Sequence, residues 1–313
     1  PIYWRSSMSF SSNAAPSLDI FIFKKQRNHH EKFRGKDWIT MTYEEKKKAL
    51  LSYIDELATE NIALAFSGGV DSSLLLKICC NATEKTGKKV YAVTIHTKLH
   101  PMKDLTISKQ IAREAGAEHI VLQIDELEEA GIKDNPEDRC YRCKKCLFQK
   151  LKAKAQEVNA GAVMEGTNED DLHVYRPGIR ALQELEILSP LARFGITKAE
   201  VRKMAAEYGM EVATRPSTPC MATRFPYGAT LSYDIMRNIE EGEEWLRTKG
   251  FYNVRLRAHQ NILRIEIDTG DFPEIIKIRE DLLNKMNDYG FDYITLDLEG
   301  FRSGSMDIHV KNK

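Results

Sequence analysis

The hexapeptide Ser-Gly-Gly-Val-Asp-Ser at residues 67–72 constrains the fold of this chain more than any other segment. Residues 62–66 before it are apolar and typical of a short buried strand, and Leu74, Leu75 and Ile78 begin an apolar helical stripe after it. Two glycines let the backbone turn sharply and direct its N–H groups outward. The helix N-terminus that follows adds unpaired donors and partial positive charge. The segment therefore predicts a phosphate-binding loop; the alternative is an ordinary glycine-rich turn.

Strand and helix patterns alternate along the chain around this loop. The predicted strands cover residues 62–66, 90–95, 119–124 and 162–165, and helices are predicted from residue 72, at 105–115 and at 147–158. Such alternation predicts an α/β fold with a parallel, doubly wound sheet and right-handed crossovers. Ligands of these sheets bind beyond the carboxyl ends of the strands. We therefore expect the hexapeptide and the segments after Ile95 and Glu165 to form one site.

Three parts are predicted along the chain. Residues 1–40 are rich in serine and basic residues, and we expect a disordered arm or a cloning remnant. Residues 41–230 form the α/β domain, in which Thr42 with Glu45 and Thr197 with Glu200 are capping boxes. Residues 231–313 form a small α+β domain with two helices, at 233–249 and 272–289, a hairpin of 253–258 with 263–268, and a strand at 293–298.

Composition excludes several classes of protein. The 46 basic residues equal the 46 acidic ones, so no overall charge favours nucleic acid. No apolar run is long enough to cross a bilayer. Six cysteines are too few for a secreted disulfide scaffold in 313 residues. We therefore expect a cytoplasmic protein with neither a membrane nor a nucleic-acid partner.

The cysteines form the second informative pattern. Cys140, Cys143 and Cys146 lie three residues apart, and Cys220 is the remaining cysteine in a predicted loop. A Cys-x-x-Cys turn lets two sulfurs reach one metal centre. Basic neighbours are expected to lower the thiol pKa values and to offset cluster charge. Three interpretations stay open: no role, structural zinc with Cys220 as the fourth ligand, or a [4Fe-4S] cluster held by three cysteines with one iron open to sulfide.

Two resemblances add to these observations. The hexapeptide resembles the pyrophosphate loop of the PP-loop ATP pyrophosphatases, whose fold is adenine nucleotide alpha-hydrolase-like. Beyond it, the chain resembles the LarE family, ATP-dependent sulfur transferases that build the nickel-pincer nucleotide cofactor. The segments that carry this resemblance, in order, are FSGGVDSSLLLK, NPEDRCYRCKK, EGTNEDDLHVYRPGIRAL, SPLARFGITKAEVR, ATRFPYG, VRLRAHQNILRIEI and LDLEGFRSGSM. They extend from about residue 62 to residue 306.

The family resemblance implies a reaction. ATP adenylates a carboxylate of pyridinium-3,5-dicarboxylate mononucleotide with release of pyrophosphate, and sulfur then replaces AMP to give a thiocarboxylate. One type of family member gives up the sulfur of a single cysteine, whose position matches Cys220. The other type holds a [4Fe-4S] cluster on three cysteines, and Cys140, Cys143 and Cys220 match its ligands, with Cys146 additional. The alternatives are sacrificial transfer from Cys220 with zinc on the triplet, or a tRNA-thiolating PP-loop enzyme.

The resemblance also implies site residues. We expect ATP to contact Ser67, Gly68, Gly69, Asp71, Ser72, Thr167 and Asn168. The expected catalytic residues are Cys220 and Asp71, and Asp71 either coordinates Mg²⁺ or caps its own helix. The expected substrate-binding residues are Arg176, Arg180, Arg224, Arg255 and Arg257. The first two are alternatively surface arginines, and the last two are alternatively paired with Glu266 on a polar sheet face. The family assembles through its small domain, which implies a homo-oligomer.

Overall fold

The computed structural model of this chain describes residues 40–99, 102–174, 177–210, 220–302 and 304–307. From Thr42 onward the chain forms one compact unit. The predicted arm falls almost entirely on residues 1–39, outside the described residues, and so stays untested. The boundary predicted near residue 230 also stays a prediction.

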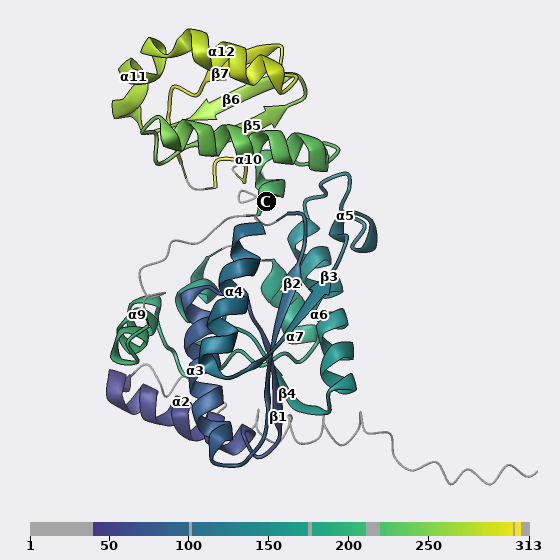
Figure 1. The fold of residues 1–313 in the computed structure, drawn as a ribbon, viewed down its shortest axis with the longest axis vertical. Helices are drawn as coiled ribbons and strands as arrows, with labels where there is room; N and C mark the ends of the chain where they lie inside the picture. Colours follow the sequence, from purple (N-terminus) through teal and green to yellow (C-terminus); the bar gives the residue numbers. More distant parts are fainter. Residues whose placement is uncertain (1–39, 100–101, 175–176, 211–219, 303, 308–313) are drawn as a thin grey trace, which may run out of the picture. The chain divides into compact units, whose positions relative to one another are not determined.

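A four-stranded parallel sheet forms the centre of the larger domain, as predicted (Figure 1). Its strands are β1 (Asn61–Ala65), β2 (Val90–His96), β3 (Glu118–Gln123) and β4 (Ala160–Met164), in the order β3-β2-β1-β4. Alternate residues of a strand face opposite sides. Ile62 and Leu64 therefore pack into one apolar core while Ala63 and Val93 pack into another. Both faces are covered, which explains why the strands read as continuous apolar runs.

Helices cover the two faces of this sheet. One face carries α2 (Tyr43–Leu57), α3 (Val70–Glu84) and α9 (Lys198–Glu207), and the other carries α6 (Arg139–Glu157) and α7 (Gly178–Glu184). The helix predicted at 105–115 is α4 (Met102–Ala115). Both predicted capping boxes are present, with the side chains of Thr42 and Thr197 accepting from the backbone N–H three residues later. Shorter elements are α5 (Glu126–Glu129), η2 (Asp170–His173), α8 (Pro190–Arg193) and η4 (Met221–Arg224).

The start of α6 differs from the prediction. We expected the helix to begin at residue 147, but it begins at Arg139. The cysteine triplet therefore lies on the first turns of a helix and not in a turn that precedes it. Its first two turns lack an apolar stripe, whereas Phe148, Leu151 and Ala155 are buried further along. The pattern that marks a packed helix begins only where α6 reaches the core.

The small domain contains a three-stranded mixed sheet and confirms the predicted α+β character. The hairpin of β5 (Arg255–His259) and β6 (Ile262–Glu266) is antiparallel, and β7 (Tyr293–Leu296) pairs with β6 in parallel. Its helices are α10 (Tyr233–Thr248), α11 (Phe272–Lys277) and α12 (Arg279–Asp288), with η5 (Thr269–Asp271) before α11. The single helix predicted at 272–289 is thus two helices, interrupted at Ile278, whose ψ of 17° departs from helical geometry. Among the described helices, none combines the length and apolarity that a bilayer span needs.

Candidate active site

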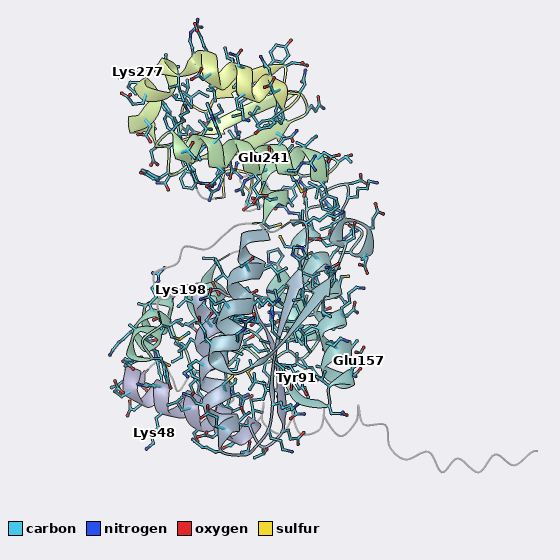
Figure 2. All side chains as sticks on the ribbon, viewed as in Figure 1. Lys48, Tyr91, Glu157, Lys198, Glu241 and Lys277 are labelled. Atoms are coloured by element: carbon cyan, nitrogen blue, oxygen red, sulfur yellow. The ribbon has the colours of Figure 1, made fainter. Side chains whose placement is uncertain are left out.

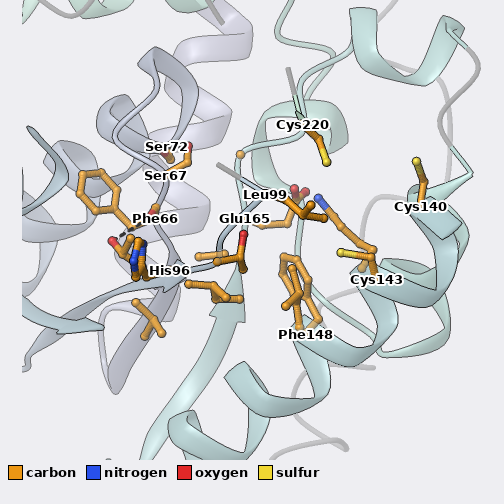
Figure 3. A pocket seen from close by; sticks show the side chains of 18 of the residues that line it. Phe66, Ser67, Ser72, His96, Leu99, Cys140, Cys143, Phe148, Glu165 and Cys220 are labelled. Carbon is orange, nitrogen blue, oxygen red and sulfur yellow. Dashed lines mark hydrogen bonds between the residues drawn. The ribbon is translucent and has the colours of Figure 1, made fainter. Parts of the chain in front are cut away.

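A cavity of about 470 Å³ lies at the carboxyl ends of β1, β2 and β4 (Figure 3). Three segments of this edge contribute lining residues: Ser67, Asp71 and Ser72 after β1, His96 and Thr97 at the end of β2, and Gly166 and Thr167 after β4. Gly68 and Gly69 do not line it. The first turns of α6, together with Cys220, line another part of its wall. The expected meeting of these loops is confirmed. Cys140, Cys143 and Cys220 line the same cavity.

The hexapeptide has the geometry of an anion-binding loop. Gly68 has a φ of +73°, and a Cβ there would lie 3.3 Å from the Cα of Ser108, so the position favours glycine twice over. The Ser67 hydroxyl accepts from the N–H of Gly69 at 3.3 Å, and the Ser72 hydroxyl donates to the Gly69 carbonyl at 3.1 Å. No side chain caps α3, whose N-cap is Gly69. The uncapped first turn leaves backbone donors for a phosphate.

Asp71 is held by two residues from other parts of the chain. Asn168 donates from Nδ2 to Asp71 Oδ1 at 3.0 Å, and Lys198 forms an ion pair with Oδ2. The expected alternative, a helix cap by Asp71, is wrong because the carboxylate is directed at Asn168 and Lys198. Asn168 itself is 2% exposed and does not line the cavity. Its role in this structure is therefore to position Asp71.

Sequence reasoning missed Lys198 as a site residue. It is the first residue of α9, directly after the capping residue Thr197 (Figure 2). The buried side chains of Val201 and Met204 pack α9 into the same core as α3. Packing between the helices thus brings the ammonium group to the phosphate loop. The only sequence signal was its place within the segment GITKAEVR.

Glu165 is a second missed residue. Its carboxylate accepts from the Thr167 N–H at 3.0 Å, from the Thr167 hydroxyl at 2.8 Å and from the Ser189 hydroxyl at 2.5 Å. Thr167, predicted as an ATP contact, lines the cavity together with Glu165. Between them, Gly166 lets the chain pass the helix, because a Cβ there would lie 3.0 Å from the backbone nitrogen of Ser72.

Three of the four candidate cysteines line the cavity. Figure 3 shows Ser67 and Ser72 on one side of it and the thiols of Cys140, Cys143 and Cys220 on the other. Cys140, Cys143, Lys144 and Leu147 share one face of α6 at helical spacing and all line the wall. Cys146 is off that face and does not line the cavity. The charged groups that act on its thiol are Lys150, Glu129 and Glu126.

Burial has the largest effect on the pKa values of two cavity thiols, Cys143 and Cys220. It raises the pKa of Cys143, and it raises the pKa of Cys220 to about 11, although Arg139 acts in the opposite direction. Among the expected basic neighbours, Lys144 acts to lower the pKa of Cys143 and Arg139 that of Cys220, but burial outweighs both and the net shift is upward. The other two neighbours are neutralised, since Arg142 pairs with Asp138 and Lys145 pairs with Glu184. Without a bound metal, these two thiols are therefore protonated at neutral pH.

Metal binding can be tested against this donor set. Within the described part of the chain, no three His, Cys, Asp or Glu side chains are gathered closely enough to hold one metal ion. A zinc ion with four thiol ligands is not favoured, because Cys146 is turned from the other three. A multi-iron cluster bridges ligands that lie further apart. Three soft ligands on a wall shared with apolar residues fit such a cluster in chemical type.

Of the five predicted substrate arginines, the four that the structure describes do not line this cavity. Arg176 falls outside the described residues. Arg180 is on the surface, where it donates to Glu184 at 2.9 Å and lies over the ring of Tyr141 at 4.6 Å. Arg224 is buried and makes two hydrogen bonds with Glu243, at 2.8 and 3.0 Å. The structure therefore does not bring Arg180 or Arg224 to the phosphate loop.

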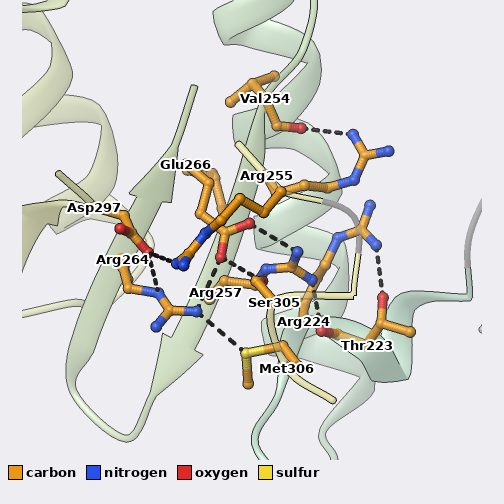
Figure 4. Close-up of polar contacts among 12 residues, drawn as sticks. Thr223, Arg224, Val254, Arg255, Arg257, Arg264, Glu266, Asp297, Ser305 and Met306 are labelled. Atoms are coloured by element: carbon orange, nitrogen blue, oxygen red, sulfur yellow. Dashed lines mark hydrogen bonds and ion pairs between the residues drawn. The ribbon is translucent and has the colours of Figure 1, made fainter. Parts of the chain in front are cut away.

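Arg255 and Arg257 have different surroundings on β5 (Figure 4). Arg257 donates to the buried carboxylate of Glu266 at 2.8 Å, which is the alternative pairing that the sequence allowed. Arg255 donates to the carbonyl of Val254 at 2.7 Å, and in the described residues it forms no ion pair. Burial and the neighbouring Arg224 lower the pKa of Arg255. Of the two, Arg255 is the one available to an anion.

Comparisons with known proteins agree with this fold and loop. The sequence profile of the PP-loop domain family matches residues 42–174, which contain the parallel sheet. The chain is 33% identical to the pyridinium-3,5-bisthiocarboxylic acid mononucleotide synthase of Lactiplantibacillus plantarum, over 83% of this chain and 93% of that protein. It is 34% identical to an uncharacterized protein of Synechocystis, over 84% of this chain and 97% of that protein. The tRNA-specific 2-thiouridylase MnmA of Rickettsia bellii is 26% identical over 66% of this chain and 65% of that protein.

The fold, the loop and the profile define this chain as a PP-loop ATP pyrophosphatase, which is a class of enzymes. Within that class the chain belongs to the LarE family, the family of the L. plantarum synthase.

Proposed function

We propose that this protein is an ATP-dependent sulfur transferase that converts a carboxylate of pyridinium-3,5-dicarboxylate mononucleotide to a thiocarboxylate. One observation carries the proposal: the phosphate loop and the thiols of Cys140, Cys143 and Cys220 line the same cavity. An activated acyl group formed at the loop would therefore not have to leave the cavity to meet sulfur. The relationship to the L. plantarum synthase supports the choice of substrate.

The first step makes the carboxylate reactive. A carboxylate oxygen attacks the α-phosphorus of ATP, the bond to the pyrophosphate oxygen breaks, and an acyl-adenylate forms. The N–H groups at the start of α3 and the hydroxyls of Ser67 and Ser72 hold the departing pyrophosphate. Lys198 adds a positive charge at the same end. Mg²⁺ bound with ATP would take carboxylate oxygens from Asp71 or Asp171, both of which line the cavity.

The second step replaces oxygen by sulfur. A sulfur nucleophile attacks the acyl carbon, the bond to AMP breaks, and the thiocarboxylate and AMP are released. A [4Fe-4S] cluster on Cys140, Cys143 and Cys220 would supply bound sulfide as this nucleophile. Leu99, Ile132 and Ala222 line the cavity as well, and they limit the access of water that would hydrolyse the adenylate.

The small domain has a separate part in the proposal. Arg255, which has no carboxylate partner in the described residues, would bind the phosphate of the substrate mononucleotide. The cavity lies in the larger domain, so this contact requires a second copy of the chain or a bound substrate that reaches between domains. We therefore retain the homo-oligomer as part of the proposal.

The test is product analysis with protein purified and reconstituted without oxygen. ATP and the dicarboxylate mononucleotide should give AMP, pyrophosphate and a thiocarboxylate in equal amounts. ATP cleavage without a sulfur-containing product would contradict the proposal. Intact mass after one turnover separates the two sulfur sources. Loss of the elements of hydrogen sulfide from Cys220 would indicate sacrificial transfer, whereas an unchanged chain mass supports the cluster.

A further inference from the structure

Arg139 occupies an unusual position at the cysteine end of the cavity. It is the first residue of α6, it is only 3% exposed, and it lines the cavity beside the three thiols. Its Nη1 donates to Asn135 Oδ1 at 2.7 Å, and its guanidinium lies 4.5 Å from the ring centre of Tyr227. Asn135 is itself fixed, because its Nδ2 donates to the Pro226 carbonyl at 2.7 Å. The guanidinium is therefore held in one place before any ligand arrives.

The charge of Arg139 is not neutralised by the protein. Three arginines are buried in the described residues, and Arg224 and Arg257 each pair with a carboxylate, Glu243 and Glu266 respectively. Arg139 forms no such ion pair in the part of the chain that the structure describes. A buried charge without a counter-charge is costly, so an arginine kept in this state indicates an anionic ligand.

The surroundings of Arg139 include one further cation and one buried carboxylate, Glu126, which acts on the thiols of Cys143 and Cys220. Lys144 lines the same wall, and its ammonium group lies 5.1 Å from the ring centre of Phe148 without an ion pair to any described carboxylate. The first turn of α6 contains no acidic residue, although acidic residues are favoured there.

The carboxylates that line the cavity serve its other end. Asp71 is paired with Lys198, and Glu165 accepts from Thr167 and Ser189. Asp171, the third carboxylate, accepts from the N–H of Asn168 at 3.3 Å. All three belong to the segments that follow β1 and β4, where the nucleotide phosphates are proposed to bind. The cavity thus has two separate groups of donors for anions: the backbone N–H groups of the phosphate loop, and the guanidinium of Arg139 among the thiols.

We propose that Arg139 binds hydrosulfide, the small sulfur anion that supplies the transferred sulfur; this inference rests on the proposed function. Hydrosulfide is monovalent and weakly hydrated, which suits a site with one fixed guanidinium and the apolar walls of Leu99, Ile132 and Ala222. Phosphate is larger and more strongly hydrated, and it already has the loop of residues 67–72. Arg139 would keep the nucleophile next to the cysteine thiols until the acyl-adenylate forms.

Bromide provides a test that requires no activity, because it matches hydrosulfide in charge and closely in radius. Crystals of the metal-free protein soaked in bromide should show an anomalous diffraction peak within hydrogen-bonding distance of the Arg139 guanidinium. Arg139→Gln should lose this peak. Arg142→Gln should keep it, since Arg142 lies on the same helix but pairs with Asp138. Wild-type crystals with bromide elsewhere and none at Arg139 would overturn the inference, and this result needs no variant to fold.

Kinetics of the reconstituted enzyme provide the second test. Arg139→Gln should raise the half-saturating sulfide concentration by roughly tenfold while the KM for ATP changes little, because one charge-assisted contact is lost. Arg139→Lys should restore part of the loss, and bromide should compete with sulfide. If the KM for the carboxylate substrate rises instead, the site binds that carboxylate and the inference is wrong. Failure of the proposed function would appear differently, as wild-type protein that forms no thiocarboxylate at any sulfide concentration.

Discussion

At the scale of single residues, the structure excludes one of the two roles predicted for Asp71 of the phosphate loop, which is capping its own helix. Asp71 is held by Asn168 and by Lys198 and caps nothing. In the proposed reaction, Lys198 transfers its interaction from the carboxylate to a phosphate oxygen of ATP, and Asp71 then binds Mg²⁺. Asp71, Asn168 and Lys198 come from different segments, so their contacts form only in the folded chain.

Replacement of this lysine tests its role in the first step. Lys198→Met should lower kcat/KM for pyrophosphate release by about 100-fold, the usual effect of losing one preorganised group that stabilises transition-state charge. Lys203→Met is a matched control, because Lys203 is on the same helix but exposed, over the ring of Tyr43. A continuous pyrophosphate assay gives both values. Equal rates for the two variants would exclude Lys198 from the site.

The cysteines also differ from one another at this scale. Cys146→Ser should keep sulfur transfer within about twofold and retain iron, since this thiol does not line the cavity. Cys143→Ser should lose both the iron and the thiocarboxylate product. Iron and sulfide content after reconstitution without oxygen, measured beside product yield, checks the pair. Loss of iron from the Cys146 variant would mean that a cysteine outside the cavity lining binds iron, which would contradict this prediction.

At the scale of elements, one carboxylate joins α10 to η4 and to β5. Glu243 is 2% exposed; it accepts two hydrogen bonds from Arg224 and one, at 3.1 Å, from the N–H of Leu256. Because removal of one partner leaves a buried charge unpaired, Glu243→Gln should lower the free energy of unfolding by about 3 kcal/mol. Glu244→Gln, on the exposed face of the same helix, should change it by less than about 0.5 kcal/mol. Urea denaturation measures both; similar values would contradict this account of α10.

The same carboxylate predicts a pH dependence. Burial acts to raise the pKa of Glu243, but the pairing with Arg224 outweighs it, and the pKa falls below its ordinary value of 4.5. The ionised form is thus favoured in the folded state, so its stabilisation is complete above the ordinary carboxyl pKa. It is lost as the pH falls through the lower, folded-state pKa. The stability difference between wild type and Glu243→Gln should therefore shrink below about pH 4. Denaturation at several pH values checks this, and a difference that grows on acidification would contradict it.

At the scale of the whole molecule, the sequence predicted the parts whose signal is local. Strand periodicity, two capping boxes and the glycines of residues 67–72 suffice for the parallel sheet and its loop. The start of α6 was missed because residues 139–146 carry no apolar stripe, and the face that four of them present lines a cavity. Lys198 was missed as the partner of Asp71, and Arg139 as a cavity residue, because their positions depend on packing between segments that are far apart in the chain. The partner of Arg224 likewise depends on folding, whereas the pairing of Arg257 with Glu266 was one of the two alternatives predicted from the hairpin.

The central claim is that one cavity joins activation of a carboxylate to its attack by sulfur. The most direct measurement uses a substrate whose carboxylate oxygens carry a heavy isotope of oxygen. If the carboxylate attacks the α-phosphorus and sulfur later displaces AMP, each AMP carries one heavy oxygen, and labelled AMP equals thiocarboxylate in amount. Mass spectrometry of both products reads this out. Thiocarboxylate formed together with unlabelled AMP would contradict the account, because the carboxylate oxygen would then never have been bonded to phosphorus.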